Sequence, residues 1–403
     1  MTIPLHADDF IVPGFRVATG YCGLRSEARP DLLLVAMDAP CRVAGLFTRN
    51  QVVAAPVTLC RERLGLGAAR ALLVNAGNAN ACTGIQGMAD AKQLTQAVAQ
   101  LLNVADEQVF PSSTGVIGVP LAVAKPLAAL PSLLQNLQAG GWERAARAIM
   151  TTDTTIKVER LTIDIDGVPV RLVGIAKGSG MIHPNMATML AYLFTDATID
   201  APVLQQLLQQ AVDQSFHCIS VDGDTSTNDT VMAFASAQAP HPAIVTTAAP
   251  QAHLLQQTMV EICQRLAQSI VRDGEGATKF ITITVSGADS RQEARQIALS
   301  VARSALVKTA FFGQDANWGR IVAAVGYAGV AFDANQLDID LGHVRIVEKG
   351  GRARDYDDRD GSNVMMQHDI PIHIHLHQGQ ESCTVWSCDF SYDYVRINAD
   401  YRT

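Results

Sequence analysis

Two runs rich in β-branched residues, 161–165 and 168–173, are separated only by Asp166-Gly167. Asp-Gly between two such runs is typical of a tight β-hairpin, because its turn needs a positive φ at both central positions. Periodicity and β-branched content predict further strands at 31–36, 70–74, 280–285 and 370–376, and helices at 88–103, 202–216, 253–271 and 291–306. Helices and strands therefore interleave without a regular βαβ repeat, which predicts a mixed α/β fold that is not of the Rossmann type.

The usual nucleotide cradles are absent from this sequence. No GxGxxG follows a predicted strand, and no GxxxxGK is followed by serine or threonine. The chain has 403 residues, of which 48% are hydrophobic, enough for one large or two smaller domains. Its formal charge of -8, with no block of basic residues, argues against a nucleic-acid partner.

The amino-terminal residues carry neither a basic leader nor a long apolar run, and no later window stays apolar long enough to cross a bilayer. We therefore expect a cytoplasmic protein with no membrane partner. Its eight cysteines are scattered without a C-x-x-C pair, so reduced thiols are expected rather than a disulfide framework or a zinc knuckle.

The segment 177–190 reads KGSGMIHPNMATML and places Thr188 directly after the small residue Ala187. A threonine hydroxyl is a weak nucleophile unless a base lies beside it, and the α-amine of the same threonine becomes that base once the preceding peptide bond is cut. Gly178 and Gly180 can take backbone conformations that strain and aim this bond. The segment therefore predicts self-cleavage, in which Thr188 attacks the Ala187 carbonyl and water hydrolyses the resulting ester.

A second segment suited to acyl transfer, 112–118, contains Thr114-Gly115. A tetrahedral intermediate needs donors aimed at its oxyanion; glycine lets a backbone N–H approach closely, and the threonine hydroxyl supplies another donor. Simpler interpretations stay open on these grounds alone. Residues 112–118 can be a tight turn between strands, and 189–194 can be an apolar helix capped by Thr188.

Several other segments accompany these two along the chain. They are NAGNANACTG at 75–84, TTDT at 151–154, DGDTSTND at 222–229, DGEGATK at 273–279, GQDANWGR at 313–320 and VRINADYRT at 395–403. Together with 112–118 and 177–190, they resemble the ornithine acetyltransferase family, also known as glutamate N-acetyltransferase. The segments occur in the family's order from near the start to the last residue, so the resemblance covers essentially the whole chain.

The resemblance implies an α/β sandwich of the ornithine acetyltransferase and aminopeptidase-like type, with a smaller carboxy-terminal α/β domain. A change of composition after Lys279 favours domains at 1–279 and 280–403. The family's self-processing implies chains of 1–187 and 188–403, and its assembly implies a heterotetramer with two copies of each chain.

The resemblance also implies roles for individual residues. Thr188 is expected to be the nucleophile, and Thr114 and Gly115 are expected to form the oxyanion hole. Substrate contacts are expected from Thr151, Lys177, Thr188, Glu275, Asn398 and Thr403. By charge, Lys177 suits a carboxylate and Glu275 suits an ammonium group. Whether Thr151 or its neighbour Thr152 contacts the substrate stays open, and an isolated lysine or glutamate can equally be an ordinary solvated charge.

The implied reaction is acetyl transfer from N-acetylornithine to glutamate through an acetyl-Thr188 intermediate, in the cyclic pathway of arginine biosynthesis. A bifunctional version would also use acetyl-CoA as a co-substrate; no metal or organic cofactor is expected. Two alternatives are an amino-terminal-nucleophile amidohydrolase or aminopeptidase of related fold, and a non-catalytic protein that binds an acetylated amino acid.

Two motifs invite a metal interpretation. Asp222-Gly-Asp224 resembles the start of a calcium loop, but Ala233 stands where the closing glutamate should be. His373, His375 and His377 would share one face of a strand, as zinc ligands sometimes do. The solvent-facing side of an amphipathic strand explains these histidines better, so no metal site is predicted.

Overall fold

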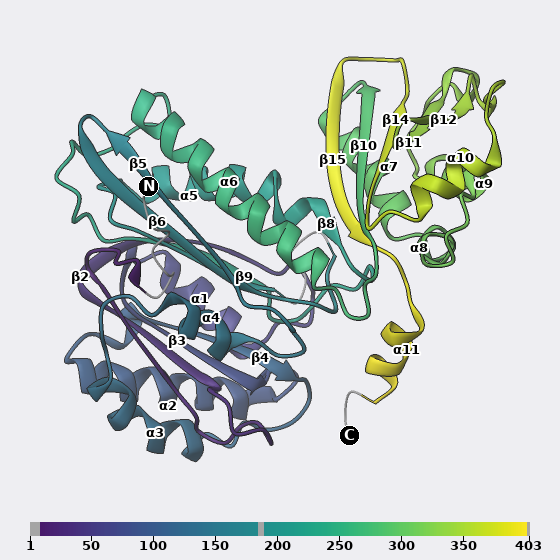
Figure 1. Cartoon of the computed structure of the whole chain (residues 1–403). Helices are drawn as coiled ribbons and strands as arrows, with labels where there is room; N and C mark the ends of the chain where they lie inside the picture. Colours follow the sequence, from purple (N-terminus) through teal and green to yellow (C-terminus); the bar gives the residue numbers. More distant parts are fainter. Residues whose placement is uncertain (1–8, 184–188, 401–403) are drawn as a thin grey trace. The chain divides into compact units, whose positions relative to one another are not determined.

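The computed structural model describes residues 9–183 and 189–400, which form two compact units (Figure 1). Unit 1 contains residues 9–178, 189–217 and 224–267. Unit 2 contains residues 179–183, 218–223 and 268–400. These compact units do not test whether domains that fold independently meet after Lys279, so that boundary stays a prediction.

Unit 1 contains a single sheet with strand order β4-β3-β2-β9-β7-β6-β5, and β1 pairs with β2. The strands are β1 (Phe15–Gly20), β2 (Leu32–Phe47), β3 (Ala68–Asn78), β4 (Val109–Val116), β5 (Lys157–Ile165), β6 (Val168–Lys177), β7 (Leu190–Thr195) and β9 (Thr230–Ala235). The helices are α1 (Ala55–Leu64), α2 (Gly84–Leu102), α3 (Ala124–Gln135), α4 (Trp142–Ile149), α5 (Ala201–Asp213) and α6 (Pro250–Arg272), whose last residues belong to unit 2.

The long strand β2 turns this sheet into a sandwich. Its first half pairs with β1 and β3, whereas residues 42–47 pair with β9, and the register with β3 shifts between Ala36 and Cys41. Phe110 of β4 and Phe234 of β9 are three strands apart in the sheet order, yet their ring centroids lie 6.4 Å apart. The sheet therefore folds over itself into two facing layers, which confirms the predicted α/β sandwich.

Aromatic rings fill the space between the two layers. Phe194 of β7 contacts Phe15, Trp142 and Phe234, with ring centroids 5.3, 4.7 and 5.4 Å away. Trp142 begins α4, which packs against strands of both layers. These side chains belong to one continuous buried cluster, so the two layers share one core.

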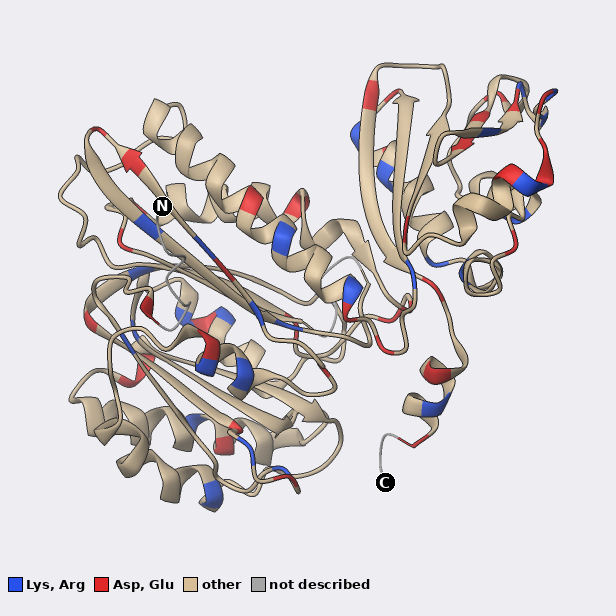
Figure 2. Ribbon diagram, in the orientation of Figure 1, with Lys and Arg blue, Asp and Glu red and all other residues tan. Residues whose placement is uncertain are grey.

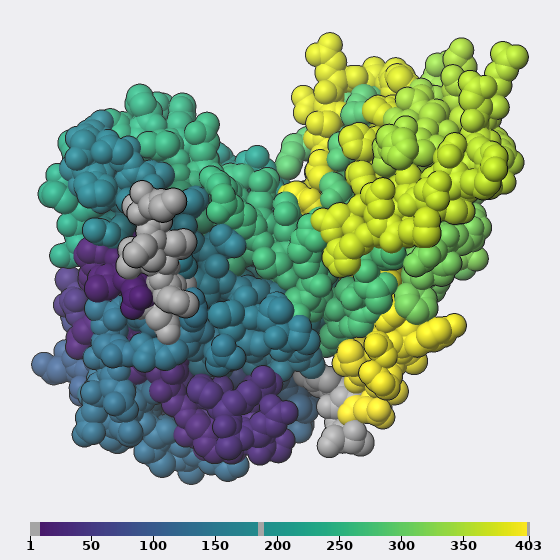
Figure 3. All heavy atoms as spheres, in the orientation of Figure 1, coloured from purple at the N-terminus to yellow at the C-terminus, as the bar shows by residue number. Residues whose placement is uncertain are grey.

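Helices cover the outer faces of the sandwich. Figure 1 shows α2 and α3 on one outer face of unit 1, and α5 and α6 on the opposite one. On the α6 side, a Cβ at Gly174 would lie 2.6 Å from Ile262 and 2.8 Å from Leu266, so a glycine lets this helix lie close to β6. In Figure 3 the purple amino-terminal segments of unit 1 lie among blue segments that follow much later in the sequence.

The hairpin expected at Asp166-Gly167 is confirmed. It joins the antiparallel strands β5 and β6, and the two turn residues have φ of 54° and 82°. The other predicted strands and helices also occur, with two differences. Residues 190–195 form β7 between β6 and β9, so the helical alternative is wrong there, because ladder hydrogen bonds on both sides outweigh local apolar content. The helix expected at 291–306 ends at Ala302, because the Ser304 side chain caps a new helix.

Unit 2 contains a sheet of order β13-β12-β11-β14-β10-β15-β8. Its strands are β8 (Ile219–Ser220), β10 (Phe280–Ala288), β11 (Asp338–Leu341), β12 (Val344–Glu348), β13 (Gly351–Arg352), β14 (Asp369–His375) and β15 (Glu381–Cys388). Its helices are α7 (Arg291–Ala302), α8 (Ala305–Phe312), α9 (Trp318–Gly326), α10 (Asp358–Met365) and α11 (Tyr392–Ala399). Helix α7 packs on β10 and β15, and α11 follows the last strand.

Basic and acidic residues are interspersed along the elements of each unit (Figure 2). The charge pattern therefore agrees with the absence of a basic block in the sequence. None of the helices formed by the described residues is both long and apolar enough to cross a membrane.

Phe194→Ala would remove the ring that contacts three other aromatic side chains between the layers. We expect the free energy of unfolding to fall by about 3–5 kcal/mol, through lost apolar burial and the cavity left behind. Urea-induced unfolding followed by circular dichroism measures this change. Tyr327→Ala, at a position that is 61% exposed, is the control. An equal effect of both variants would contradict a core shared by the two layers.

Candidate active site

Thr114 and Gly115 lie near the end of β4, beside the end of β3. The two strands are parallel, with Ala76 opposite Thr114 and Gly77 opposite Gly115, and their register shifts at Asn78. Gly115 has φ of 132°, and a Cβ there would lie 2.3 Å from the carbonyl carbon of Gly77. Only glycine fits this close approach. Residues 112–116 are thus part of a strand, and the simpler interpretation of a turn between strands is wrong for them.

Lys177 brings a buried charge to Thr114. It is the last residue of β6, is 1% exposed, and its Nζ donates a hydrogen bond of 3.2 Å to Thr114 Oγ1. Because the Thr114 hydroxyl accepts this bond, its own proton stays available for donation to another oxygen. Burial lowers the pKa of Lys177, whereas the Asp153 carboxylate acts in the opposite direction.

Asp153 organises the backbone around Lys177. Its carboxylate accepts N–H bonds from Gly178 (2.6 Å) and Thr151 (2.9 Å), and it binds Lys157 Nζ at 2.8 Å. Burial alone would raise the pKa of Asp153, but Lys177, Lys157 and the N–H donors outweigh it and lower the pKa to about 2. The Thr151 loop is thereby tied to the residue that follows Lys177. Asp153 was not assigned a role from sequence, although it lies within the TTDT segment.

Asp229 holds the start of β7. The Met189 N–H donates to its Oδ1 at 3.0 Å. The residues that follow Met189 and Asp229, Leu190 of β7 and Thr230 of β9, are partners in the parallel ladder. Burial raises the pKa of this fully buried carboxyl well above its ordinary value, which favours the protonated form. Ala187 and Thr188 themselves lie outside the described residues. The structure therefore describes an anchor for the chain immediately after them, and sequence reasoning missed it.

A buried amide network supports the ends of β3 and β4. Asn228 Nδ2 donates to the carbonyl oxygens of Ala79 (2.6 Å) and Ser113 (2.8 Å). The Ser113 hydroxyl in turn donates to Asn75 Oδ1 at 2.6 Å. These polar groups are buried and paired, so they fix the backbone that carries Thr114 and Gly115. The signal available in the sequence was the clustering of Asn and Asp in the segments 75–84 and 222–229.

In unit 2, Glu275 and Asn398 are brought together. Asn398 Nδ2 donates to Glu275 Oε2 at 2.9 Å, and the Glu275 N–H donates to the carbonyl of Ser179, the second residue after Lys177 in the sequence. Glu275 is 7% exposed, and a Cβ at Gly180 would lie 2.4 Å from its carboxylate. Gly180 thus leaves room for this carboxylate. Thr403, the last of the predicted substrate contacts, lies outside the described residues.

Close packing at Gly276 positions the helix that carries Asn398. A Cβ on Gly276 would lie 2.5 Å from the Tyr394 N atom, so the absence of a side chain lets α11 approach. The Ser391 hydroxyl donates to the Gly276 carbonyl at 2.6 Å and also caps α11. The glycine that follows Glu275 in the sequence therefore has a packing reason.

The two motifs considered for metals serve other contacts. Asp222 accepts the N–H groups of Met181 (2.5 Å) and Ile182 (2.9 Å). His375 and His377 contact Asp340 and Asp338 at 3.1 and 3.0 Å. Within the ranges 9–183 and 189–400, no three His, Cys, Asp or Glu side chains are grouped so as to hold a metal ion.

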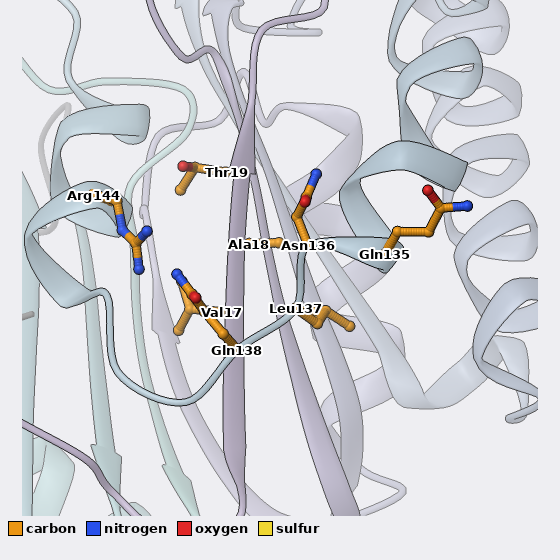
Figure 4. A pocket seen from close by; sticks show the side chains of 8 residues that line it. All are labelled: Val17, Ala18, Thr19, Gln135, Asn136, Leu137, Gln138 and Arg144. Atoms are coloured by element: carbon orange, nitrogen blue, oxygen red, sulfur yellow. The ribbon is translucent and has the colours of Figure 1, made fainter. Parts of the chain in front are cut away.

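A pocket of about 460 Å³ lies between β1 and the connection from α3 to α4 (Figure 4). Val17, Ala18, Thr19, Gln135, Asn136, Leu137, Gln138 and Arg144 line it. None of the predicted site residues is among them. Its lining offers no nucleophile with an adjacent base, so we do not place the chemistry there.

Comparisons with known proteins agree on one family. The ArgJ family model matches residues 16–403. The "Arginine biosynthesis bifunctional protein ArgJ" of Methylococcus capsulatus is 50% identical over 393 residues, covering 97% of this chain and 96% of that protein. The protein of the same name from Colwellia psychrerythraea is 44% identical over 409 residues, covering 97% of this chain and 96% of that protein.

A solved structure gives the same family. The crystal structure of the arginine biosynthesis bifunctional protein argJ from Bacillus halodurans has a TM-score of 0.50 and 39% sequence identity. The match covers 52% of this chain and 97% of that chain. Over the matched part of the chain, the mixed α/β fold is therefore that of this ArgJ structure.

Asp153→Asn would remove the carboxylate that faces two buried lysines. At pH 7 we expect the free energy of unfolding to fall by about 3–5 kcal/mol, because both ammonium groups lose their counter-charge. The pKa of Asp153 is about 2 in the folded protein against an ordinary 3.8, so its stabilisation is present above pH 4 and is lost as the pH falls towards 2. Urea unfolding at pH 7 and pH 3 measures both effects.

The control for this experiment is Asp38→Asn, which breaks an exposed ion pair with Arg16. Such a pair contributes about 0–1 kcal/mol. A difference between Asp153→Asn and the wild type that does not shrink at pH 3 would contradict the assigned charge state.

Proposed function

Because this chain belongs to the ArgJ family of arginine biosynthesis enzymes, we propose that it transfers the acetyl group of N-acetylornithine to glutamate. The family match, which spans nearly the whole chain, favours this function over an amidohydrolase and over a non-catalytic binding protein. The observation that carries the proposal is the buried hydrogen bond from Lys177 to Thr114, beside a glycine that no other residue can replace.

The acid–base features of this group suit acyl transfer. Thr114 has a hydroxyl proton to donate, since its oxygen already accepts from Lys177. Gly115 has no Cβ to shield its N–H group. Two such donors stabilise the oxyanion of a tetrahedral intermediate, and removing one donor in a comparable site costs about 3 kcal/mol of transition-state stabilisation.

We assign the nucleophile to Thr188. Its α-amine takes the hydroxyl proton, and the oxygen attacks the acetyl carbonyl of N-acetylornithine. The tetrahedral intermediate collapses, the carbon–nitrogen bond breaks, and ornithine leaves with the proton as a free amine. The amine of glutamate then attacks the acetyl-Thr188 ester, which releases N-acetylglutamate and restores the hydroxyl. The bond from Met189 to Asp229 supports this assignment, because it anchors the residue that follows Thr188.

A free α-amine on Thr188 requires cleavage of the Ala187–Thr188 bond by the same hydroxyl. The match to the Bacillus halodurans structure supports this step. The match spans 97% of that solved chain but only 52% of this one, so the solved chain is about half as long as this one. The segment 188–403 is likewise about half of this chain.

Charge and burial support the roles of the substrate-binding residues. The ammonium group of Lys177 has three N–H donors, of which one binds the Thr114 hydroxyl. The other N–H groups can bind a substrate carboxylate. Glu275, held by Asn398, suits the side-chain ammonium of ornithine. Thr151 is kept as the threonine that contacts substrate, and Thr403 as the contact from the carboxy terminus.

The remaining features of the proposed enzyme follow from the chemistry and the family. Both half-reactions exchange one acyl group, so the reaction needs no metal or organic cofactor. The two relatives are named as bifunctional, and we propose acetyl-CoA as a second acetyl donor. We place the enzyme in the cytoplasm, as a heterotetramer of its two processed chains.

Intact mass under denaturing conditions tests self-processing. We expect two pieces, 1–187 and 188–403, the second beginning with Thr188, in place of one chain of 43.1 kDa. Thr188→Ala should stay uncut because it lacks the attacking oxygen, and Thr188→Ser should still be cut. A wild-type protein that remains one chain while it transfers acetyl groups would refute the proposed nucleophile.

Initial rates with varied N-acetylornithine and glutamate test the reaction. An acetyl-enzyme intermediate gives parallel double-reciprocal lines, whereas direct transfer gives intersecting lines. Thr114→Val should lower kcat by about 100- to 1000-fold, because it removes one oxyanion donor. Thr58→Val, on α1 at a position without a proposed role, is the matched control. Water replacing glutamate as the acceptor at an equal rate would favour the hydrolase instead.

A further inference from the structure

The two proposed substrates pose a problem of charge. Ornithine carries one carboxylate and a side-chain ammonium group, which Lys177 and Glu275 match. Glutamate carries a second carboxylate in place of that ammonium group. Lys177 and Glu275 supply one cation and one anion, so neither offers a partner for the second carboxylate of glutamate.

Arg25 lies beside the proposed oxyanion residues in unit 1. A Cβ on Gly77 would be 3.0 Å from its Cγ, and Gly77 is the strand partner of Gly115. Its Nη2 donates to the carbonyl of Met150, the residue before Thr151. The side chain thus runs from the oxyanion strands to the loop that carries Thr151.

The guanidinium of Arg25 has N–H donors that are not used in hydrogen bonds to the described residues. Its Nε and Nη1 are buried and have no hydrogen-bond partner among residues 9–183 and 189–400. A buried charged donor without a partner is more costly than a neutral one, so a structural role alone explains the arrangement poorly. Arg25 as a residue is only half-buried, so rotation of its terminal torsions can present these donors to a ligand.

The backbone around Arg25 is held in place. Asp31 is fully buried and accepts the N–H groups of Leu24 (2.8 Å) and Arg25 (3.3 Å). Arg29 donates to the Thr151 carbonyl at 2.8 Å, so a second guanidinium reaches the same loop. Burial, followed by the charge of Arg29, lowers the pKa of Arg25 to about 10, which leaves it protonated at neutral pH. The carboxylates of Asp31, Glu27 and Asp153 act in the opposite direction, and Arg29 is paired with Glu27 at 3.0 Å. An anionic ligand is therefore favoured by the N–H donors that Arg25 itself leaves unused.

We propose that Arg25 binds the side-chain carboxylate of glutamate and so determines specificity for the acetyl acceptor. A guanidinium offers a fork of parallel N–H donors that matches the two oxygens of a carboxylate. The inference rests on the proposed acetyl transfer. It adds a residue that is needed when glutamate is the acceptor of the acetyl group. Ornithine as acceptor has no second carboxylate, so it does not need Arg25.

The test compares two reactions of one enzyme. The first is acetyl transfer from N-acetylornithine to glutamate, and the second is exchange of the acetyl group between N-acetylornithine and isotopically labelled ornithine. For Arg25→Gln we expect kcat/KM for glutamate to fall about 10- to 100-fold, mainly through KM. The exchange with ornithine should change less than about threefold, within the spread of an uninvolved position.

Further variants and substrates make the result specific. Arg25→Lys keeps the charge but loses the fork, so its kcat/KM for glutamate should lie between those of the wild type and Arg25→Gln. Arg16→Gln, on β1, is the matched control, because it removes an arginine from an exposed ion pair. The wild type should prefer glutamate over glutamine, whose side-chain amide is uncharged, and Arg25→Gln should reduce this preference at least tenfold.

The outcomes separate the two proposals. An equal loss of both reactions in Arg25→Gln, or an unchanged preference for glutamate over glutamine, would refute the role of Arg25 and leave the acetyl transfer intact. A wild-type enzyme that performs neither reaction would refute the proposed function itself. Selective loss with glutamate, with exchange preserved, is the expected result and shows that the variant is folded.

Discussion

The buried carboxylate of Asp153 is the interaction on which the candidate site in unit 1 depends. It accepts two backbone N–H groups and the Lys157 ammonium, and its charge also stabilises Lys177. A lysine that is 1% exposed keeps its proton in an apolar core only when anions compensate its lost hydration. Without Asp153, Lys177 would have reason to lose its proton or to leave the core. A side chain that left the core would lose its hydrogen bond to Thr114, and a deprotonated one would keep only an uncharged donor there.

That hydrogen bond also joins the two layers of the sandwich. Thr114 belongs to the layer formed by β3 and β4, and Lys177 ends a strand of the facing layer. Folding of the sheet at β2 is therefore what makes the pair possible. Aromatic rings set the spacing of the layers from within, and Gly77 and Gly115 set the close approach of β3 and β4 at the edge. Packing and chemistry depend on the same backbone positions.

The elements of secondary structure were largely predictable from local patterns. The Asp166-Gly167 hairpin follows from the preference of these two residues for positive φ. The helical alternative was wrong for 189–194, and the prediction was incomplete for 291–306. In the first case a short apolar run cannot indicate whether strands lie on both sides of it. In the second, a serine side chain that caps a new helix interrupts an otherwise continuous periodic pattern.

The candidate site divides in the same way. Thr114, Gly115, Lys177 and Glu275 could be named from sequence because glycine-flanked polar residues carry a chemical meaning and resemble a known family. Arg25, Asp153, Asn228 and Asp229 could not be given roles, because their importance comes from burial and from partners far away in the chain. The sequence by itself determined the mixed α/β class, the family and the residues that bear reactive groups, since these depend on local pattern and residue chemistry. Only the tertiary structure decided which charges are buried, paired or left with free donors, because hydration is lost only where distant segments pack together.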